Sequence, residues 1–294
     1  MSAGLVFVHG RGEEGKNPAT LAHDWLVALD AGLIQAGLPR LDGAPVAFPY
    51  YGNELFRITA ELARTGERIE LEALPAAGPE AIPFHPLVTT DVGAIERRLI
   101  ADMVDAHPAP PVDDESLLDH LQDTLSWSGA RLALEWLSRN SRFDREVIEA
   151  FLRDVAVYLT RGRDRVLDIV RAAIPPDVPI VLVSHSLGTV VARDLLDDAD
   201  IRNRTRLWVT AGAPLAMPTI QKNLRTPGLH NPGVPWVTTF DVNDIVALGH
   251  PLHRTWGDPL TDVEVDNGNQ PHSITRYLGH GDVARPIGLA VTTD

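Results

Sequence analysis

The stretch 179–196 holds the residues of this sequence that are best suited to covalent chemistry. It reads PIVLVSHSLGTVVARDLL, and its centre is a variant of the motif G-x-S-x-G. In that motif small residues let the chain reverse sharply from a strand into a helix, which lifts the central hydroxyl clear of the sheet. The hydroxyl then lies at a helix N-terminus, where free N–H groups favour negative charge. Ser186 is therefore the candidate nucleophile, with Ser184 in place of the first glycine.

The residues on either side have the patterns that such a turn requires. Ile180 to Val183 form a short apolar, β-branched run, which is typical of a strand buried on both faces. The apolar positions after Gly188 fit the spacing of a helix. An ordinary strand–loop–helix with a capping serine is the alternative, and the presence of strand, turn and helix together favours the nucleophile.

On this strand–SHSLG–helix arrangement the chain resembles the α/β-hydrolase superfamily, in particular its lipase- and esterase-like members. The resemblance implies a Ser-His-Asp triad whose members follow in the chain order serine, acid, histidine, each in a loop after a strand. A serine nucleophile argues against epoxide hydrolases and dehalogenases, which use aspartate at that position.

The resemblance places the acid in the segment DVNDIV, residues 241–246, directly after a predicted strand. This segment is similar to the superfamily's G-x-x-D-x-V loop, with Asp244 at the acid position. Asp241 stands where glycine is usual and is the alternative acid; the carboxylate that is not used would form a turn.

Eleven histidines compete for the role of base. His272 follows the last predicted strand and precedes a short helix, as the base does in the families that the chain resembles, and His280 is the alternative. His250 and His253 lie too soon after the acid, in a proline-broken loop. His185 adjoins the nucleophile, and a residue there is expected to point away into packing.

The oxyanion site is predicted from the first strand, Leu5–Val8, and the His9-Gly10 dipeptide that follows it. In the hydrolases that the chain resembles, this dipeptide begins the oxyanion loop. The backbone N–H groups of Arg11 and Leu187 would then hold the developing negative charge.

The same loop comes close to a nucleotide-binding P-loop, with Gly10, four residues, then Gly15-Lys16. Asn17 occupies the position that must supply a hydroxyl for magnesium, and no later strand ends in a Walker-B aspartate. The loop therefore disfavours nucleotide binding.

The expected fold class is α/β, a doubly wound and mainly parallel sheet of the α/β-hydrolase type with an inserted helical cap. Six short strand patterns, separated mostly by helical ones, carry this expectation: 5–8, 44–49, 180–183, 206–211, 235–241 and 262–265.

Between residues 53 and 142 strand patterns disappear, and prolines interrupt helical ones. We expect a core of residues 1–52 and 143–294, with 53–142 as a helical cap or lid; a decorative subdomain or a dimer interface is the alternative. Tyr50 and Tyr51, at the end of the second strand, are candidate pocket residues, with packing at the rim as the alternative.

Composition excludes several classes of function. The net charge of −14 argues against nucleic acid as a partner, and the absence of cysteine excludes disulfides and thiolate catalysis. No H-E-x-x-H motif and no run of 18 apolar residues occurs, so we expect no metal site and no membrane span. The N-terminus MSAGLVFVHG fits a first strand and not a signal peptide, which favours a cytoplasmic location.

Together these features predict a serine hydrolase that needs no cofactor and cleaves the carboxylic ester of a small molecule or lipid. A serine peptidase or phospholipase of the same fold is an alternative. A hydrolase-like scaffold that only binds is another, because Ser184 and Asp241 replace glycines of the motifs. The sequence leaves the oligomeric state open.

Overall fold

The computed structural model describes residues 2–65, 90–107 and 127–293. Its centre is a six-stranded, all-parallel sheet with the order β2-β1-β3-β4-β5-β6. The strands are β1 Gly4–Val8, β2 Val46–Ala47, β3 Ile180–His185, β4 Thr205–Ala211, β5 Trp236–Phe240 and β6 Leu260–Glu264. All six strand predictions overlap these elements, and the α/β class is confirmed.

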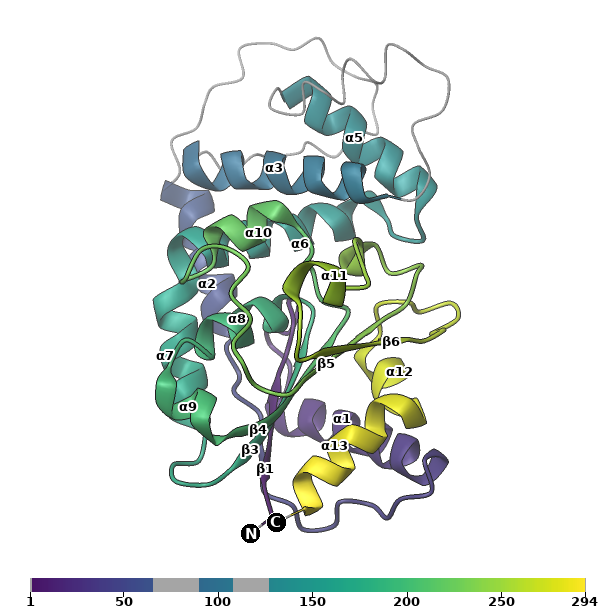
Figure 1. Cartoon of the computed structure of the whole chain (residues 1–294). Coiled ribbons are helices and arrows are strands. Elements are labelled where there is room, and N and C mark those ends of the chain that lie inside the picture. The colour runs from purple at the N-terminus through teal and green to yellow at the C-terminus, as the bar shows by residue number, and fades with distance from the viewer. Residues whose placement is uncertain (1, 66–89, 108–126, 294) are drawn as a thin grey trace.

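Helices cover both faces of the sheet (Figure 1). One face packs against α1 (Pro18–Gln35), α12 (Ile274–Gly279) and α13 (Gly281–Thr292). Helix α1 begins at Pro18, where the Asn17 side chain accepts a hydrogen bond from the Ala19 N–H and caps the helix.

The second face packs against α7 (Arg163–Ala173) and α8 (Leu187–Leu195). Helix α6 (Arg145–Val157) continues through a π-helical turn, Tyr158–Gly162, into α7. Shorter helices complete this side: α9 (Ala199–Arg204), α10 (Pro218–Asn223), the 3-10 turn Ile245–Ala247 and α11 (His253–Trp256).

A further group of helices lies beyond the carboxyl ends of the strands (Figure 1). It contains α3 (Thr90–Ala106) and α5 (Trp127–Asn140), which pack against each other and against α6. Helix α2 (Gly52–Thr65) packs against α6 and α7. The described parts of 53–142 are thus helical, and residues 66–89 and 108–126 lie outside the described residues.

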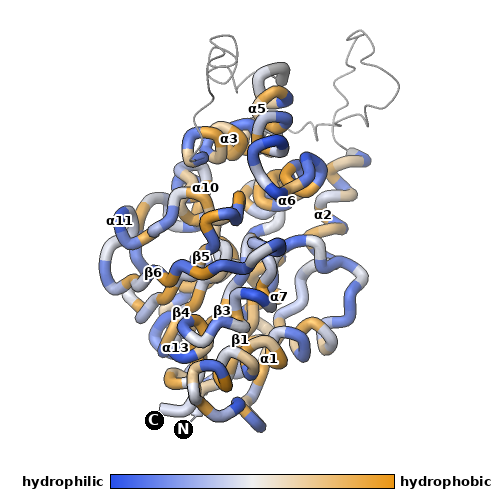
Figure 2. The backbone as a smooth tube through the Cα atoms, turned by 90° about the vertical axis from the view of Figure 1, so that its right-hand side faces the viewer, coloured by the Kyte–Doolittle hydropathy of each residue, from blue (hydrophilic) through white to orange (hydrophobic). Residues whose placement is uncertain are grey.

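Apolar and polar residues alternate along the helices (Figure 2), and the buried apolar residues form one core on each face of the sheet. Alternate residues of β3 enter the two cores: Val181 and Val183 one, Ile180 and Leu182 the other. Such double burial explains why the first four residues of this strand are all apolar. No described helix has the length and apolar character needed to cross a membrane.

The two ends of the chain lie together at the edge of the sheet away from α3 and α5 (Figure 1). The Ala3 N–H donates to the Val291 carbonyl at 3.0 Å. This bond joins the residue before β1 to the last helix, α13.

Candidate active site

Ser186 lies at the sharp turn between β3 and α8 and has a strained backbone. Its φ is +55° and its ψ is −129°, a conformation that residues other than glycine rarely adopt. Such strain costs on the order of 1–3 kcal/mol and concentrates at functional sites. The surrounding structure holds the turn in part through the Ser186 N–H, which donates to the Ala211 carbonyl of β4 at 3.0 Å.

Two glycines allow the loop after β1 to approach this turn closely. A Cβ on Gly188 would lie 2.3 Å from the carbonyl oxygens of both Val8 and His9, and one on Gly10 would lie 2.9 Å from Ser186 Cβ. Neither position has room for a side chain. The motif therefore needs a glycine at position 188 because the loop after β1 contacts the Ser186 turn there.

Ser184, in place of the first glycine, fits without conflict. Its side chain is fully buried between β3 and β4, where Oγ donates to the Val209 carbonyl at 3.1 Å and accepts from Trp208 Nε1 at 2.9 Å. The departure from the motif thus adds two hydrogen bonds to the sheet beneath Ser186.

His272 and Asp244 form a hydrogen-bonded pair at the carboxyl edge of the sheet. Asp244 Oδ2 accepts from His272 Nδ1 at 2.8 Å, and its other oxygen accepts from the Val246 N–H at 3.0 Å. Gly212, with a φ of +56°, makes room for the pair: a Cβ there would lie 2.8 Å from Asp244 Oδ2 and 3.0 Å from His272 Nδ1.

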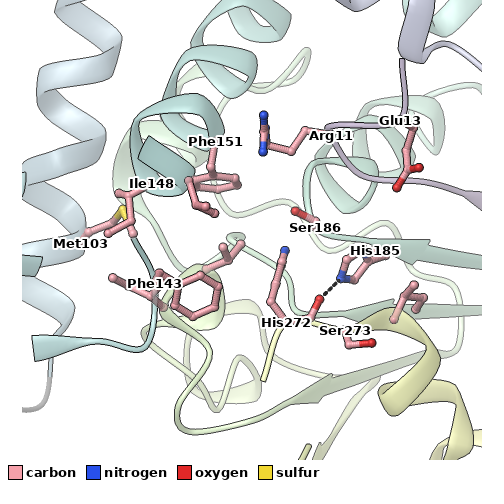
Figure 3. A pocket seen from close by; sticks show the side chains of 14 residues that line it. Arg11, Glu13, Met103, Phe143, Ile148, Phe151, His185, Ser186, His272 and Ser273 are labelled. Atoms are coloured by element: carbon pink, nitrogen blue, oxygen red, sulfur yellow. Dashed lines mark hydrogen bonds between the residues drawn. The ribbon is translucent and has the colours of Figure 1, made fainter. Parts of the chain in front are cut away.

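The His272 ring points toward the hydroxyl of Ser186 across the same cavity (Figure 3). Within the described residues Ser186 Oγ is buried and has no hydrogen-bond partner. The structure therefore brings together the three residues that were predicted as a triad, with the hydroxyl free to bond to an incoming group.

The alternative acid and base have other partners. The Asp241 carboxylate accepts from the N–H groups of Asn243 at 2.7 Å and Asn267 at 2.6 Å, so it shapes the two loops that carry Asp244 and His272. His280 Nε2 bonds to Asn267 Oδ1 at 3.1 Å. His253, another of the competing histidines, pairs with Asp262 at 2.7 Å.

Tyr277 is a residue of this site that the sequence reasoning missed. Its side chain is fully buried, and its hydroxyl donates to Asp244 Oδ2 at 2.8 Å, the same oxygen that accepts from His272. The hydroxyl also accepts from the Asp241 N–H at 3.0 Å. The only available signal was a tyrosine five positions after the candidate histidine.

His185 does not point away from the site, contrary to the expectation. It lines the cavity, and its Nε2 donates to the backbone carbonyl of His272 at 3.0 Å. The two rings lie 4.5 Å apart. Burial lowers the pKa of His185 well below its usual value, so this ring is neutral at pH 7.

The cavity at these residues has a volume of about 260 Å³. Its polar wall contains Arg11, Glu13, His185, Ser186, His272 and Ser273, and its apolar wall contains Met103, Phe143, Val147, Ile148, Phe151, Ile245, Val246 and Ile274. Of the apolar side chains labelled in Figure 3, Met103 belongs to α3, and Ile148 and Phe151 belong to α6. Phe143 lies two positions before α6 begins.

Tyr50 and Tyr51, the candidate pocket residues, are not in this lining. The Tyr50 hydroxyl donates to the Glu13 carbonyl at 2.5 Å, and that of Tyr51 donates to the His9 carbonyl. Both tyrosines therefore hold the loop after β1 in place. This corrects the expectation that they line the pocket, because their hydroxyls are directed at the loop backbone.

Arg11 and Leu187, the predicted oxyanion residues, flank Ser186 from two segments. Within the part of the chain that the structure describes, neither backbone N–H donates to another group. The Arg11 side chain lines the cavity, and its Nε donates to Asp154 Oδ2 of α6 at 2.8 Å. This contact fixes the loop that carries one of the two free N–H groups.

The residues of the P-loop-like segment have partners within the protein. The Asn17 side chain caps α1, Lys16 Nζ lies 2.9 Å from Glu13 Oε2, and the Gly15 N–H donates to Asn53 Oδ1 at 2.8 Å. Among the described residues no group of three or more potential ligands could hold a metal ion.

Comparison with family models, with curated proteins and with solved structures found no match in any of the three. The geometry of this site is therefore the basis on which a function can be proposed.

Proposed function

We propose that this protein is a serine hydrolase of the α/β-hydrolase type that cleaves a carboxylic ester. The observation that carries the proposal is the strained turn at Ser186, whose unpaired hydroxyl faces the ring of the His272–Asp244 pair across one cavity. This combination supplies a nucleophile, a base and a group that orients the base.

In the proposed mechanism Ser186 Oγ attacks the ester carbonyl carbon while His272 Nε2 takes its proton. Asp244 holds the ring through Nδ1–H and stabilises the imidazolium that forms. The N–H groups of Arg11 and Leu187 bind the oxyanion. His272 then protonates the leaving alcohol, and a water molecule activated by the same ring releases the acid from Ser186.

The cavity favours a substrate with a small apolar acyl group. Its volume of about 260 Å³ lies just below the range of about 300–1,000 Å³ that is typical of sites for drug-sized ligands. Apolar side chains of α3 and α6 face the polar wall that contains Ser186. We propose that these helices act as the cap of the enzyme and that the acyl group lies against them.

A fluorophosphonate probe, which reacts with activated serines, tests the proposal. We expect labelling of the purified protein at Ser186, located by mass spectrometry, and none in Ser186→Ala. Ser273→Ala is the matched control, because Ser273 lines the same cavity without a turn like that of Ser186. Absence of labelling, or equal labelling of Ser186→Ala, would falsify the proposal.

A panel of p-nitrophenyl esters from acetate to palmitate, with peptide and phospholipid substrates, then defines the substrate class. We expect short and medium acyl esters to be cleaved fastest. Faster cleavage of peptides or of phospholipids would replace the ester proposal with a peptidase or a phospholipase. Absence of both labelling and turnover of any substrate would favour the scaffold that only binds.

A further inference from the structure

We infer that Tyr277 is a positioning residue of this site, which extends the Ser-His-Asp arrangement by a fourth member acting through Asp244. The inference rests on the proposed function. Asp244 Oδ2 accepts hydrogen bonds from both Tyr277 Oη and His272 Nδ1, each at 2.8 Å.

The hydrogen-bond pattern fixes the direction of the tyrosine hydroxyl. Tyr277 Oη accepts from the Asp241 N–H at 3.0 Å, so its single hydrogen is directed at Asp244. Burial raises the pKa of Tyr277 well above its usual value, so the phenol remains a donor at every pH at which the protein would work.

Tyr277 also connects the segment that carries the base to the loop that carries the acid. It lies on α12, the helix that begins two residues after His272, while Asp241 and Asp244 lie in the loop after β5. The hydroxyl therefore holds the acid loop and the segment of the base in one arrangement. A hydrogen bond to a charged group is stronger than one between two neutral groups. The bond from Tyr277 Oη to the Asp244 carboxylate therefore contributes substantially to the preorganisation of the site.

The expected effect of removing the hydroxyl has two parts. Tyr277→Phe loosens Asp244 and leaves the Asp241 N–H without its acceptor, so kcat should fall about tenfold or more with little change in KM. A neutral donor also draws negative charge from Oδ2. Without the Tyr277 hydroxyl, more of the negative charge on Asp244 Oδ2 faces the His272 ring, which favours the protonated ring. The acid limb of the kcat/KM profile should therefore move to higher pH.

The groups that face His272 within the described residues support this interpretation of the acid limb. They are Asp244, Ser186 and His185, with Arg11 and Glu13 farther along the cavity wall. His185 is kept neutral by burial, so it adds no charge that would titrate in the same range.

The experiment compares Tyr277→Phe with Tyr158→Phe. Tyr158 is also fully buried and donates to a buried carboxylate, Asp194 Oδ2 at 2.9 Å, but it lies in the π-helical turn outside the cavity. We expect both variants to lose similar stability in urea unfolding. Only Tyr277→Phe should lose kcat and shift the acid limb.

A second substitution at the same position keeps the inference testable if the Tyr277→Phe protein does not fold. Tyr277→3-fluorotyrosine keeps the ring and makes the hydroxyl a stronger donor, so the acid limb should move to lower pH. The role of Tyr277 is contradicted if the two phenylalanine variants have equal kcat values and equal acid limbs. It is also contradicted if the acid limb of the fluorinated protein does not move. Either outcome leaves the proposed function intact. A wild-type protein that the fluorophosphonate probe does not label overturns the proposed function as well.

Discussion

Arg11 and Asp154 join two segments that are 143 positions apart in the chain, through a hydrogen bond of 2.8 Å from Arg11 Nε to Asp154 Oδ2. One residue belongs to the loop after β1 and the other to α6. Burial raises the pKa of Asp154, and the guanidinium of Arg11 opposes this shift. The helix that forms much of the apolar cavity wall therefore also holds the proposed oxyanion loop.

We expect Asp154→Ala to lower kcat for an ester about tenfold, because the Arg11 N–H loses its fixed position. This is less than the loss of about 10²–10³ that follows removal of an oxyanion donor itself. Glu149→Ala is the control: its ion pair with Arg145 lies on the same helix with the same side-chain exposures, 27% and 17%. Equal kcat values in the two variants would contradict the role of Asp154.

Ile148 offers a test of where the acyl group lies. It is 2% exposed and lines the apolar wall of the cavity. Ile148→Trp should fill part of the space, so kcat/KM for the hexanoate ester should fall about tenfold or more while that for acetate changes little. Leu289→Trp on α13, outside the cavity lining, should leave the preference unchanged. A parallel loss for both esters would mean that the acyl group lies elsewhere.

Gly188→Ala should destabilise the fold by about 2 kcal/mol or more, because its Cβ would lie 2.3 Å from two backbone carbonyl oxygens. Gly279→Ala at the end of α12 is the control, since a Cβ there meets nothing within 4 Å. Urea unfolding measures both. Similar free energies of unfolding in the two variants would show that the β1 loop moves easily away from the Ser186 turn.

His9 should make stability depend on pH. Its Nδ1 donates to the Gly10 carbonyl and its Nε2 accepts from the Tyr51 N–H, so a second proton would find no acceptor. Burial lowers the pKa of His9 from 6.5 to about 4. The unfolded chain takes up the proton below pH 6.5 and the folded protein does not, so stability present above pH 6.5 is lost as the pH falls toward 4.

The measurement is urea unfolding at pH 7 and pH 5. Between these values the wild type should lose about 2 kcal/mol more than His9→Gln. His23→Gln, at an exposed position of α1, controls for the loss of a histidine. If His9→Gln loses as much stability as the wild type, another group causes the pH dependence.

The sequence predicted most of what positions the site, because that part depends on local patterns. Buried parallel strands are apolar runs, and parallel strands bring the loops at their carboxyl ends to one edge. The strand positions followed from the first rule. The choice of Asp244 and His272 came from the resemblance to the α/β-hydrolase superfamily, which implies an acid and a base in loops after strands.

The remaining contacts depend on how distant elements pack. Tyr277 reaches Asp244 because of where α12 lies relative to the loop after β5. His185 meets the carbonyl of His272 from a position 87 residues earlier in the chain. Tyr50 and Tyr51, which follow β2, bond to the backbone of the loop after β1. No spacing along the chain encodes these placements.

The hydrogen bond between Ala3 and Val291 has a practical consequence. Because both ends of the chain meet on the side opposite the cavity, either one can be anchored to a surface, a fluorophore or a fusion partner without crowding the loops that line the cavity. A protein immobilised in this way would present its cavity outward, which suits single-molecule and flow-based assays.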